Sequence, residues 1–225
     1  MLNPNRVMVI AAHPDDEVLG CGGVMALHIR AGHDVSVVIA AGRSAEESGT
    51  GRSQSSMTQQ ALAELGVKDI AQLGLPDQKL DTLPILQIVQ LLEREVERVL
   101  PTVIYVHHHG DVNRDHRVIH EAAMVATRPT RDHINVVYAY ETASSTEWGY
   151  PRSFNPDTFV DIGDVLEMKT RAMELYSDEL RDYPHPRSIE GLRAKAVHTG
   201  VANCLGPMEA FVTIRRIYRD GQAPV

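Results

Sequence analysis

The chain has 225 residues, of which 43% are hydrophobic and 23% are charged, a composition typical of one globular domain with a single core. Its formal net charge of -8 argues against general binding to nucleic acid or to anionic membranes, because both need a basic surface. No apolar run reaches the roughly 20 residues that span a bilayer, so we expect no membrane insertion.

Apolar, β-rich runs alternate with helical patterns from the first residues onward. In chain order, the pattern predicts a buried strand at 6–13, a helix at 17–31 that ends at Gly32, and a strand at 34–41. Residues 42–56 are polar and rich in glycine and serine, which predicts a mobile loop at the rim of a site. Such alternation is typical of parallel strands joined by helical crossovers.

The same alternation continues to the end of the chain. It predicts helices at 56–65, 84–99, 114–127, 164–177 and 188–200, and strands at 69–73, 102–107, 136–140, 158–161 and 210–218. No internal repeat or linker divides the sequence. We therefore predict one domain over residues 1–225, an α/β fold with a mostly parallel sheet flanked by helices.

Two stretches that follow predicted strands are rich in metal-binding side chains. The first is His13-Pro14-Asp15-Asp16-Glu17, and the second runs from His107 to His116. In an open parallel sheet, ligands bind beyond the carboxyl ends of the strands. His13 and Asp16 are three residues apart across a turn, a spacing that brings both side chains to one side and leaves Asp15 pointing elsewhere. With His116 as a third ligand they predict a catalytic metal site, and Asp115 is beside His116 as an orienting carboxylate.

Each of these residues alone has a simpler interpretation. Carboxylates at a helix start complement the helix dipole and cap free N–H groups, and a single histidine is more often a surface residue than a ligand. The combination of both stretches is what favours a metal. Gly20, Gly22 and Gly23 indicate close packing of the first helix on the sheet, and "GCGG" does not match the G-x-G-x-x-G fingerprint of a dinucleotide site.

The segment "AAHPDDEVLGCGG" resembles the first motif of the PIG-L/LmbE-like family, zinc-dependent de-N-acetylases of N-acetylated amino sugars and their conjugates. "NRDHRVIH" (113–120) resembles the second motif, an H-P-D-H-like segment followed by a helix. The resemblance implies a Rossmann-like fold and one Zn²⁺ per chain on His13, Asp16 and His116. It also implies Asp15 as general base and an orienting role for Asp115. The implied reaction removes the acetyl group of a small GlcNAc-type sugar or conjugate, releasing acetate and a free amine.

One position departs from the family pattern. The first histidine of H-P-D-H aligns with Asn113, which can hydrogen-bond an oxyanion but cannot act as an acid. We expect Asn113 to stabilise the oxyanion and Asp15 to return its proton to the amine, with His107, His108, His109 and His185 as other candidate donors. "YPHPRS" resembles a bacterial branch of the family. It makes His185 and Arg187 candidates for the substrate rim, or else parts of a solvated surface turn.

Two other functions stay open at this point. A zinc amidohydrolase of a non-sugar amide would use the same metal chemistry with a different pocket, and a nucleotide-binding module would use the acidic turn only to cap a helix. Cys21 and Cys204 are the only cysteines, and "MLNPNRVMVI" lacks the pattern of a secretion signal. We expect a cytoplasmic protein with a small-molecule substrate, and leave open whether it forms a homo-oligomer.

Overall fold

The structure, a computed structural model, describes residues 5–43 and 54–219. Its strands are β1 (Arg6–Ala11), β2 (Asp34–Ala41), β3 (Asp69–Leu75), β4 (Val103–His107), β5 (Val136–Tyr140), β6 (Thr158–Asp161) and β7 (Met208–Arg216). Its α-helices are α1 (Asp16–Arg30), α2 (Gln54–Glu64), α3 (Ile85–Val99), α4 (Arg114–Ala126), α5 (Leu166–Glu174) and α6 (Ile189–Ala202). Short 3-10 helices lie at Leu80–Thr82, Thr146–Trp148 and Gly163–Val165. Of the predicted loop at 42–56, residues 44–53 lie outside the described part.

All seven strands form one sheet in the order β3-β2-β1-β4-β5-β7-β6. The pairs from β3 through β5 are parallel, as the alternation of strands and helices predicts. The chain adds β2 and then β3 on one side of β1, and it then crosses over to add β4 and β5 on the other side of β1. The reversal between β1 and β4 is the point where open α/β sheets bind their ligands.

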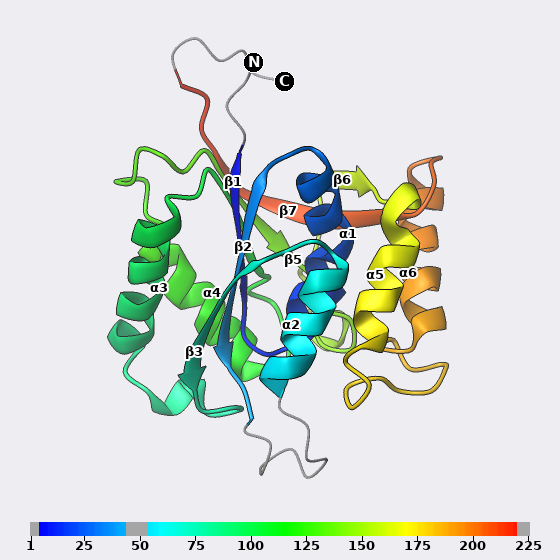
Figure 1. Cartoon of the computed structure of the whole chain (residues 1–225), viewed down its shortest axis with the longest axis horizontal. Helices are drawn as coiled ribbons and strands as arrows, with labels where there is room; N and C mark the ends of the chain where they lie inside the picture. The colour runs from blue at the N-terminus through cyan, green and yellow to red at the C-terminus, as the bar shows by residue number, and fades with distance from the viewer. Residues whose placement is uncertain (1–4, 44–53, 220–225) are drawn as a thin grey trace.

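Helices cover both faces of the sheet, so the molecule has three layers (Figure 1). On one face α1, α2, α5 and α6 pack over a core that includes Val7, Val9 and Phe211. On the other face α3 and α4 pack over Met8, Ile10 and neighbours. The residues of β1 from Val7 onward are all buried, because both faces of this central strand are covered. The α/β prediction is confirmed.

The C-terminal strands differ from the rest of the sheet. β7 pairs antiparallel with both β5 and β6, which the pattern of the sequence did not specify beyond a mostly parallel sheet. The predicted helix at 164–177 is shorter, because its first turn is the 3-10 helix Gly163–Val165. None of the helices at residues 5–43 and 54–219 has the length and hydrophobicity that a bilayer crossing requires.

The glycines of α1 allow the close packing that their positions predict. A Cβ atom on Gly20 would lie 2.2 Å from Cδ2 of Tyr140 on β5, and one on Gly23 would lie 2.6 Å from Cγ2 of Ile162. The Tyr140 ring has little room to yield, because it is fully buried and its hydroxyl donates to the carbonyl of Ile10 at 2.9 Å. α1 therefore sits directly on the sheet, and its N-terminus is held at the switch point.

Candidate metal centre and active site

A cavity of about 220 Å³ opens at the edge of the sheet where the parallel strands end. The segments after each of the strands β1 to β5 contribute to its wall, as expected for the carboxyl edge of a parallel sheet. The first motif supplies His13, Asp15 and Asp16, and the second supplies Asn113 and His116. Both predicted stretches therefore line one cavity.

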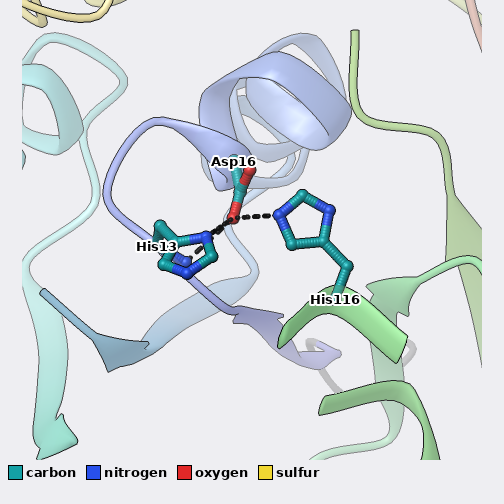
Figure 2. A group of neighbouring side chains, drawn as sticks. All are labelled: His13, Asp16 and His116. Atoms are coloured by element: carbon teal, nitrogen blue, oxygen red, sulfur yellow. Dashed lines mark hydrogen bonds and ion pairs between the residues drawn. The ribbon is translucent and has the colours of Figure 1, made fainter. Parts of the chain in front are cut away.

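Three side chains from these motifs converge on one point (Figure 2). Oδ2 of Asp16, at the start of α1, lies 3.4 Å from Nδ1 of His13 and 3.3 Å from Nε2 of His116 on α4. The three ligand atoms lie within 4.8 Å of one another. The local turn holds the first pair together, because the backbone N–H of His13 donates to Asp16 at 2.8 Å.

Each imidazole faces a second carboxylate with its other nitrogen. Nε2 of His13 lies 3.0 Å from Oδ2 of Asp115, and Nδ1 of His116 lies 3.1 Å from Oδ2 of Asp111. A ring N–H held by a carboxylate fixes the tautomer and directs the opposite lone pair toward a metal. The lone pairs of both rings would then point toward Asp16. Each histidine would lie between an outer carboxylate and a shared metal position, as in carboxylate–histidine–metal sites.

Asp115 therefore contacts His13, whereas the sequence neighbourhood suggested that it orients His116. Successive helical residues point about 100° apart, so Asp115 and His116 on α4 face different groups. The residue beside His116 is Asp111, which the sequence analysis did not single out. It is buried and also accepts hydrogen bonds from Ser145, from Thr146 Oγ1 at 2.7 Å and from the N–H of Asn113 at 2.8 Å.

The pKa values of the adjacent Asp15 and Asp16 carboxylates are shifted in opposite directions. Burial raises the pKa of Asp15, and Asp16 and Glu179 raise it further while Arg187 opposes them. Burial also acts to raise the pKa of Asp16, but His116 and His107 hold it well below the usual range. Pairs of acids whose pKa values are pushed apart mark a division between proton transfer and charge stabilisation. The site therefore drives Asp15 toward its protonated form and holds Asp16 ionised.

The carboxylates around both imidazoles favour the protonated, positively charged form of each ring. Burial alone would lower the pKa of His13, but hydrogen bonds with Asp115 and Asp16 raise it to about 10. Burial opposes the same change at His116, where Asp16 and Asp111 raise the pKa to about 9. Two nitrogens, a carboxylate oxygen and an excess of nearby negative charge fit a borderline divalent cation.

Two further groups of potential ligands in the described residues overlap this one, namely His107-Asp111-His116 and His13-Asp77-Asp115. His107 is poorly suited to bind a metal, because its Nε2 accepts the backbone N–H of Ala12 at 2.9 Å and its Nδ1 lies 3.1 Å from the Thr142 hydroxyl. Burial and His116 lower the pKa of His107 to about 4, so its ring is neutral and stacks on that of His116 with centroids 4.0 Å apart.

Asn113 has a structural task besides its place in the cavity wall. It is the N-cap of α4, and its side-chain oxygen accepts the backbone N–H of Asp115 at 2.9 Å. This bond occupies the oxygen and leaves the NH₂ group as the end of the amide that can donate a hydrogen bond.

The two C-terminal candidates, Arg187 and His185, differ in their position relative to the cavity. Arg187 lines the cavity, and its Nη1 lies 3.4 Å from Oδ2 of Asp15 and 3.6 Å from Oε2 of Glu179. His185 is not among the residues that line the cavity, and its ring lies edge-on to that of the exposed Trp148 with centroids 5.8 Å apart. Arg187 thus contacts Asp15, a relation that residues 172 positions apart do not reveal in the sequence.

Known proteins resemble this chain in sequence and in fold. Residues 8–127, more than half of the chain, match the PIG-L family, described as GlcNAc-PI de-N-acetylase. The uncharacterized deacetylase YaiS of Escherichia coli K12 is 30% identical over 162 residues, which cover 69% of this chain and 81% of that protein. The diacetylchitobiose deacetylase of Thermococcus kodakarensis is 26% identical over 196 residues, covering 77% of this chain and 70% of that protein.

Solved structures share the whole fold at lower identity. The conserved protein TT1542 of Thermus thermophilus superposes with a TM-score of 0.77 at 21% identity, covering 98% of this chain and all of that one. The hydratase GalB of Pseudomonas putida has a TM-score of 0.75 at 20% identity, with 96% and 99% covered. A zinc-inhibited form of teicoplanin deacetylase Orf2 has a TM-score of 0.74 at 16% identity, with 96% and 100% covered.

Proposed function

The chain belongs to the PIG-L family of GlcNAc-PI de-N-acetylases, and we propose that it is a zinc-dependent deacetylase of N-acetylated amino sugars or their conjugates. The proposed reaction hydrolyses the acetamide C–N bond. Water supplies OH to the acetyl carbon and a proton to the nitrogen, so that acetate and a free amine are released.

The arrangement around Asp16 is the observation that carries this proposal. Two imidazoles flank its carboxylate, and each has a carboxylate behind it, Asp115 on His13 and Asp111 on His116. A helix-capping role alone does not require this arrangement, and the Asp15 side chain makes no capping hydrogen bond to α1. A purely nucleotide-binding role for the acidic turn is therefore disfavoured.

In the proposed site, His13, Asp16 and His116 would hold one Zn²⁺. When bound, the ion would act as a Lewis acid on the amide carbonyl and lower the pKa of water. Asp15 accepts a proton from the attacking water, since its carboxylate lines the cavity beside the proposed ligands. The NH₂ group of Asn113 donates to the developing oxyanion. Asp15 then returns its proton to the amine.

The surroundings of the proposed proton donors favour Asp15 over the histidines. His107 is engaged at both ring nitrogens, and Nδ1 of His108 accepts the N–H of Gly110 at 3.1 Å. Neither of these rings, nor His109 or His185, is among the described residues that line the cavity.

The cavity suits a small polar substrate. Its volume of about 220 Å³ is below the roughly 300–1,000 Å³ typical of small-molecule sites, and hydroxyl, amide and charged groups dominate its wall. We propose that the N-acetylated ring enters this cavity and that Trp148 and His185 contact the portion of the conjugate outside it, because each of them shares a hydrogen bond with a residue of the cavity wall, Trp148 with Ser145 and His185 with Arg187. We also propose a cytoplasmic location, where the free thiols of Cys21 and Cys204 would stay reduced.

Acetate release and metal content together test the proposal. The panel should contain N-acetylglucosamine, diacetylchitobiose, nucleotide-linked and lipid-linked N-acetylglucosamine, and simple acyl amides. We expect turnover on one of the sugars that chelation abolishes and Zn²⁺ restores. Turnover confined to the simple amides would establish the non-sugar amidohydrolase. Because Orf2 has a zinc-inhibited form, the metal should be titrated up to one equivalent and beyond.

Two neighbouring substitutions separate the proposed roles. Asp15→Asn should leave one metal bound and lower turnover about 100-fold or more, the usual scale for a positioned general base. Asp16→Asn should lower metal affinity. Equal loss of metal in both variants would contradict the assignment of Asp15 as base and Asp16 as ligand.

A further inference from the structure

Glu17 is a fully buried acid whose two oxygens are both engaged. Oε2 accepts the backbone N–H of Asp15 at 3.1 Å, and Oε1 accepts the hydroxyl of Tyr176 at 2.5 Å. Tyr176 follows α5 and is itself fully buried. The carboxylate thus connects the backbone of the proposed general base to the helical layer that covers α1.

Asp15 has a backbone conformation that a side chain normally disfavours. Its φ is 101° and its ψ is -33°, although it is not a glycine. Non-glycine residues keep such angles only where the surroundings impose them, and they cluster at active sites. On its carboxyl side, the Asp15 carbonyl accepts the N–H groups of Val18 and Leu19 at 3.0 and 2.9 Å. On its amino side, the N–H of Asp15 donates to Oε2 of Glu17.

Helix capping accounts for this contact only in part. In a capping box the N-cap side chain bonds the helix and the third helical residue returns a bond to the N-cap N–H. Here Glu17 is the second helical residue, and the Asp15 side chain makes no capping bond to the helix. It lines the cavity instead, 3.4 Å from Arg187. A cap also needs no burial, whereas removing a carboxylate from water is unfavourable unless its position has another use.

We propose that Glu17, anchored by Tyr176, is a positioning residue that holds Asp15 in the backbone conformation that directs its carboxylate into the cavity. The inference rests on the proposed function of Asp15 as the general base. Displacing a reacting group by about 1 Å costs up to about 100-fold in rate, so a lost anchor acts on kcat.

Three substitutions and a matched control test the inference. Glu17→Ala removes both contacts, Tyr176→Phe removes the outer one, and Glu17→Gln retains an oxygen for the Asp15 N–H and an NH₂ group that can donate to Tyr176. Glu209→Gln is the control. Glu209 is also buried and accepts N–H groups of α1, from Gly23 and Val24 at 2.8 Å each, but does not contact Asp15.

We expect Glu17→Ala to lower kcat about 10–100-fold, with KM and bound zinc within about twofold of the parent. Glu17→Gln should recover most of kcat, Tyr176→Phe should lose less than Glu17→Ala, and Glu209→Gln should lower the melting temperature while keeping kcat. Equal kcat in Glu17→Ala and the parent would overturn the inference. So would a loss of kcat in Glu209→Gln that matches the loss in Glu17→Ala.

Crystal structures of the variants provide a reading that does not depend on activity. In Glu17→Ala, φ of Asp15 should leave the positive region or its carboxylate should leave the cavity, and Glu17→Gln should keep both. If Asp15 is unchanged in Glu17→Ala, the positioning role is wrong whatever the reaction is. If the parent protein releases acetate from no substrate, the proposed function fails, and the Asp15 geometry still decides the role of Glu17.

Discussion

Replacing Asp111 by asparagine probes the metal centre through a residue that would not itself touch the metal. The carboxylate accepts hydrogen bonds from three groups, the Ser145 and Thr146 hydroxyls and the N–H of Asn113, and its Oδ2 lies 3.1 Å from Nδ1 of His116 as an ion pair. Asparagine replaces one oxygen by an NH₂ group, which donates and therefore opposes one of these donors. The N–H of His116 loses its charged partner, so the ring is held less firmly with its Nε2 toward Asp16.

The contacts of Asp111 set the expected changes in metal affinity and in stability. Loss of an outer carboxylate on a metal-binding histidine typically lowers metal affinity about 10–100-fold. Leaving a buried donor unsatisfied costs about 1–3 kcal/mol, which for a chain of this size corresponds to a fall of roughly 2–12 °C in melting temperature without metal. The pKa of His116 should also fall, because Asp111 is one of the groups that raise it.

Competition with a coloured zinc chelator measures the affinity, calorimetry of the metal-free protein measures the stability, and NMR titration follows His116. Ser145→Ala is the control, because it removes one donor to Asp111 but leaves the carboxylate against His116. It should bind zinc within about threefold of the parent, well inside the loss expected at Asp111. An Asp111→Asn protein with unchanged zinc affinity and an unchanged His116 pKa would refute the reasoning.

Three other predictions concern the cap, the charges and the packing. Asn113→Ala should lose roughly 10–1,000-fold in turnover with zinc retained, and it should also lose the helix cap. Asn113→Ser should keep the cap and still lose turnover. A fully active Asn113→Ala, beside an inactive His108→Ala or His185→Ala, would identify a histidine as the acid. Without metal, His13 and His116 have pKa values raised above the unfolded value near 6.5, so their stabilisation is complete below about pH 6.5 and is lost as pH rises through about 9 to 10. Zinc binding near pH 8 should therefore release up to two protons, which calorimetry in buffers of different ionisation enthalpy detects; no release would contradict the protonated rings. Gly20→Ala should destabilise the fold by up to about 2 kcal/mol, because overpacking against Tyr140 costs about 1–3 kcal/mol and the gain in helix propensity is about 1 kcal/mol; a higher melting temperature would show that the ring can move aside.

The sequence alone was sufficient to predict the order and type of the main helices and strands. Every predicted α-helix and strand has a counterpart, most with ends within two or three residues, because hydrophobic period and glycine positions are local properties. The antiparallel placement of β7 was not predictable in this way, since a strand pattern carries no direction. The three short 3-10 helices were also missed, because single turns leave no periodic pattern to read.

In the site, the sequence by itself determined the residues within each motif. The three-residue spacing of His13 and Asp16 places both on one side of a single turn, and strand ends of a parallel sheet bring the second motif to the same edge. The choice of His116 as third ligand came from its position at the start of the helix in the second stretch. The proximity of these side chains could be inferred because it depends on spacing along the chain and on the direction of the strands.

Only the tertiary structure decided which groups face each other across elements. Asp115 is next to His116 in the chain but contacts His13, while Asp111 faces His116. Tyr176 reaches Glu17 across 159 positions, and Arg187 reaches Asp15 across 172. Such contacts depend on the strand order and on how α4, α5 and the segment before α6 pack around the cavity. Because a rotation of one helical residue redirects a side chain by about 100°, sequence neighbours cannot stand in for spatial neighbours.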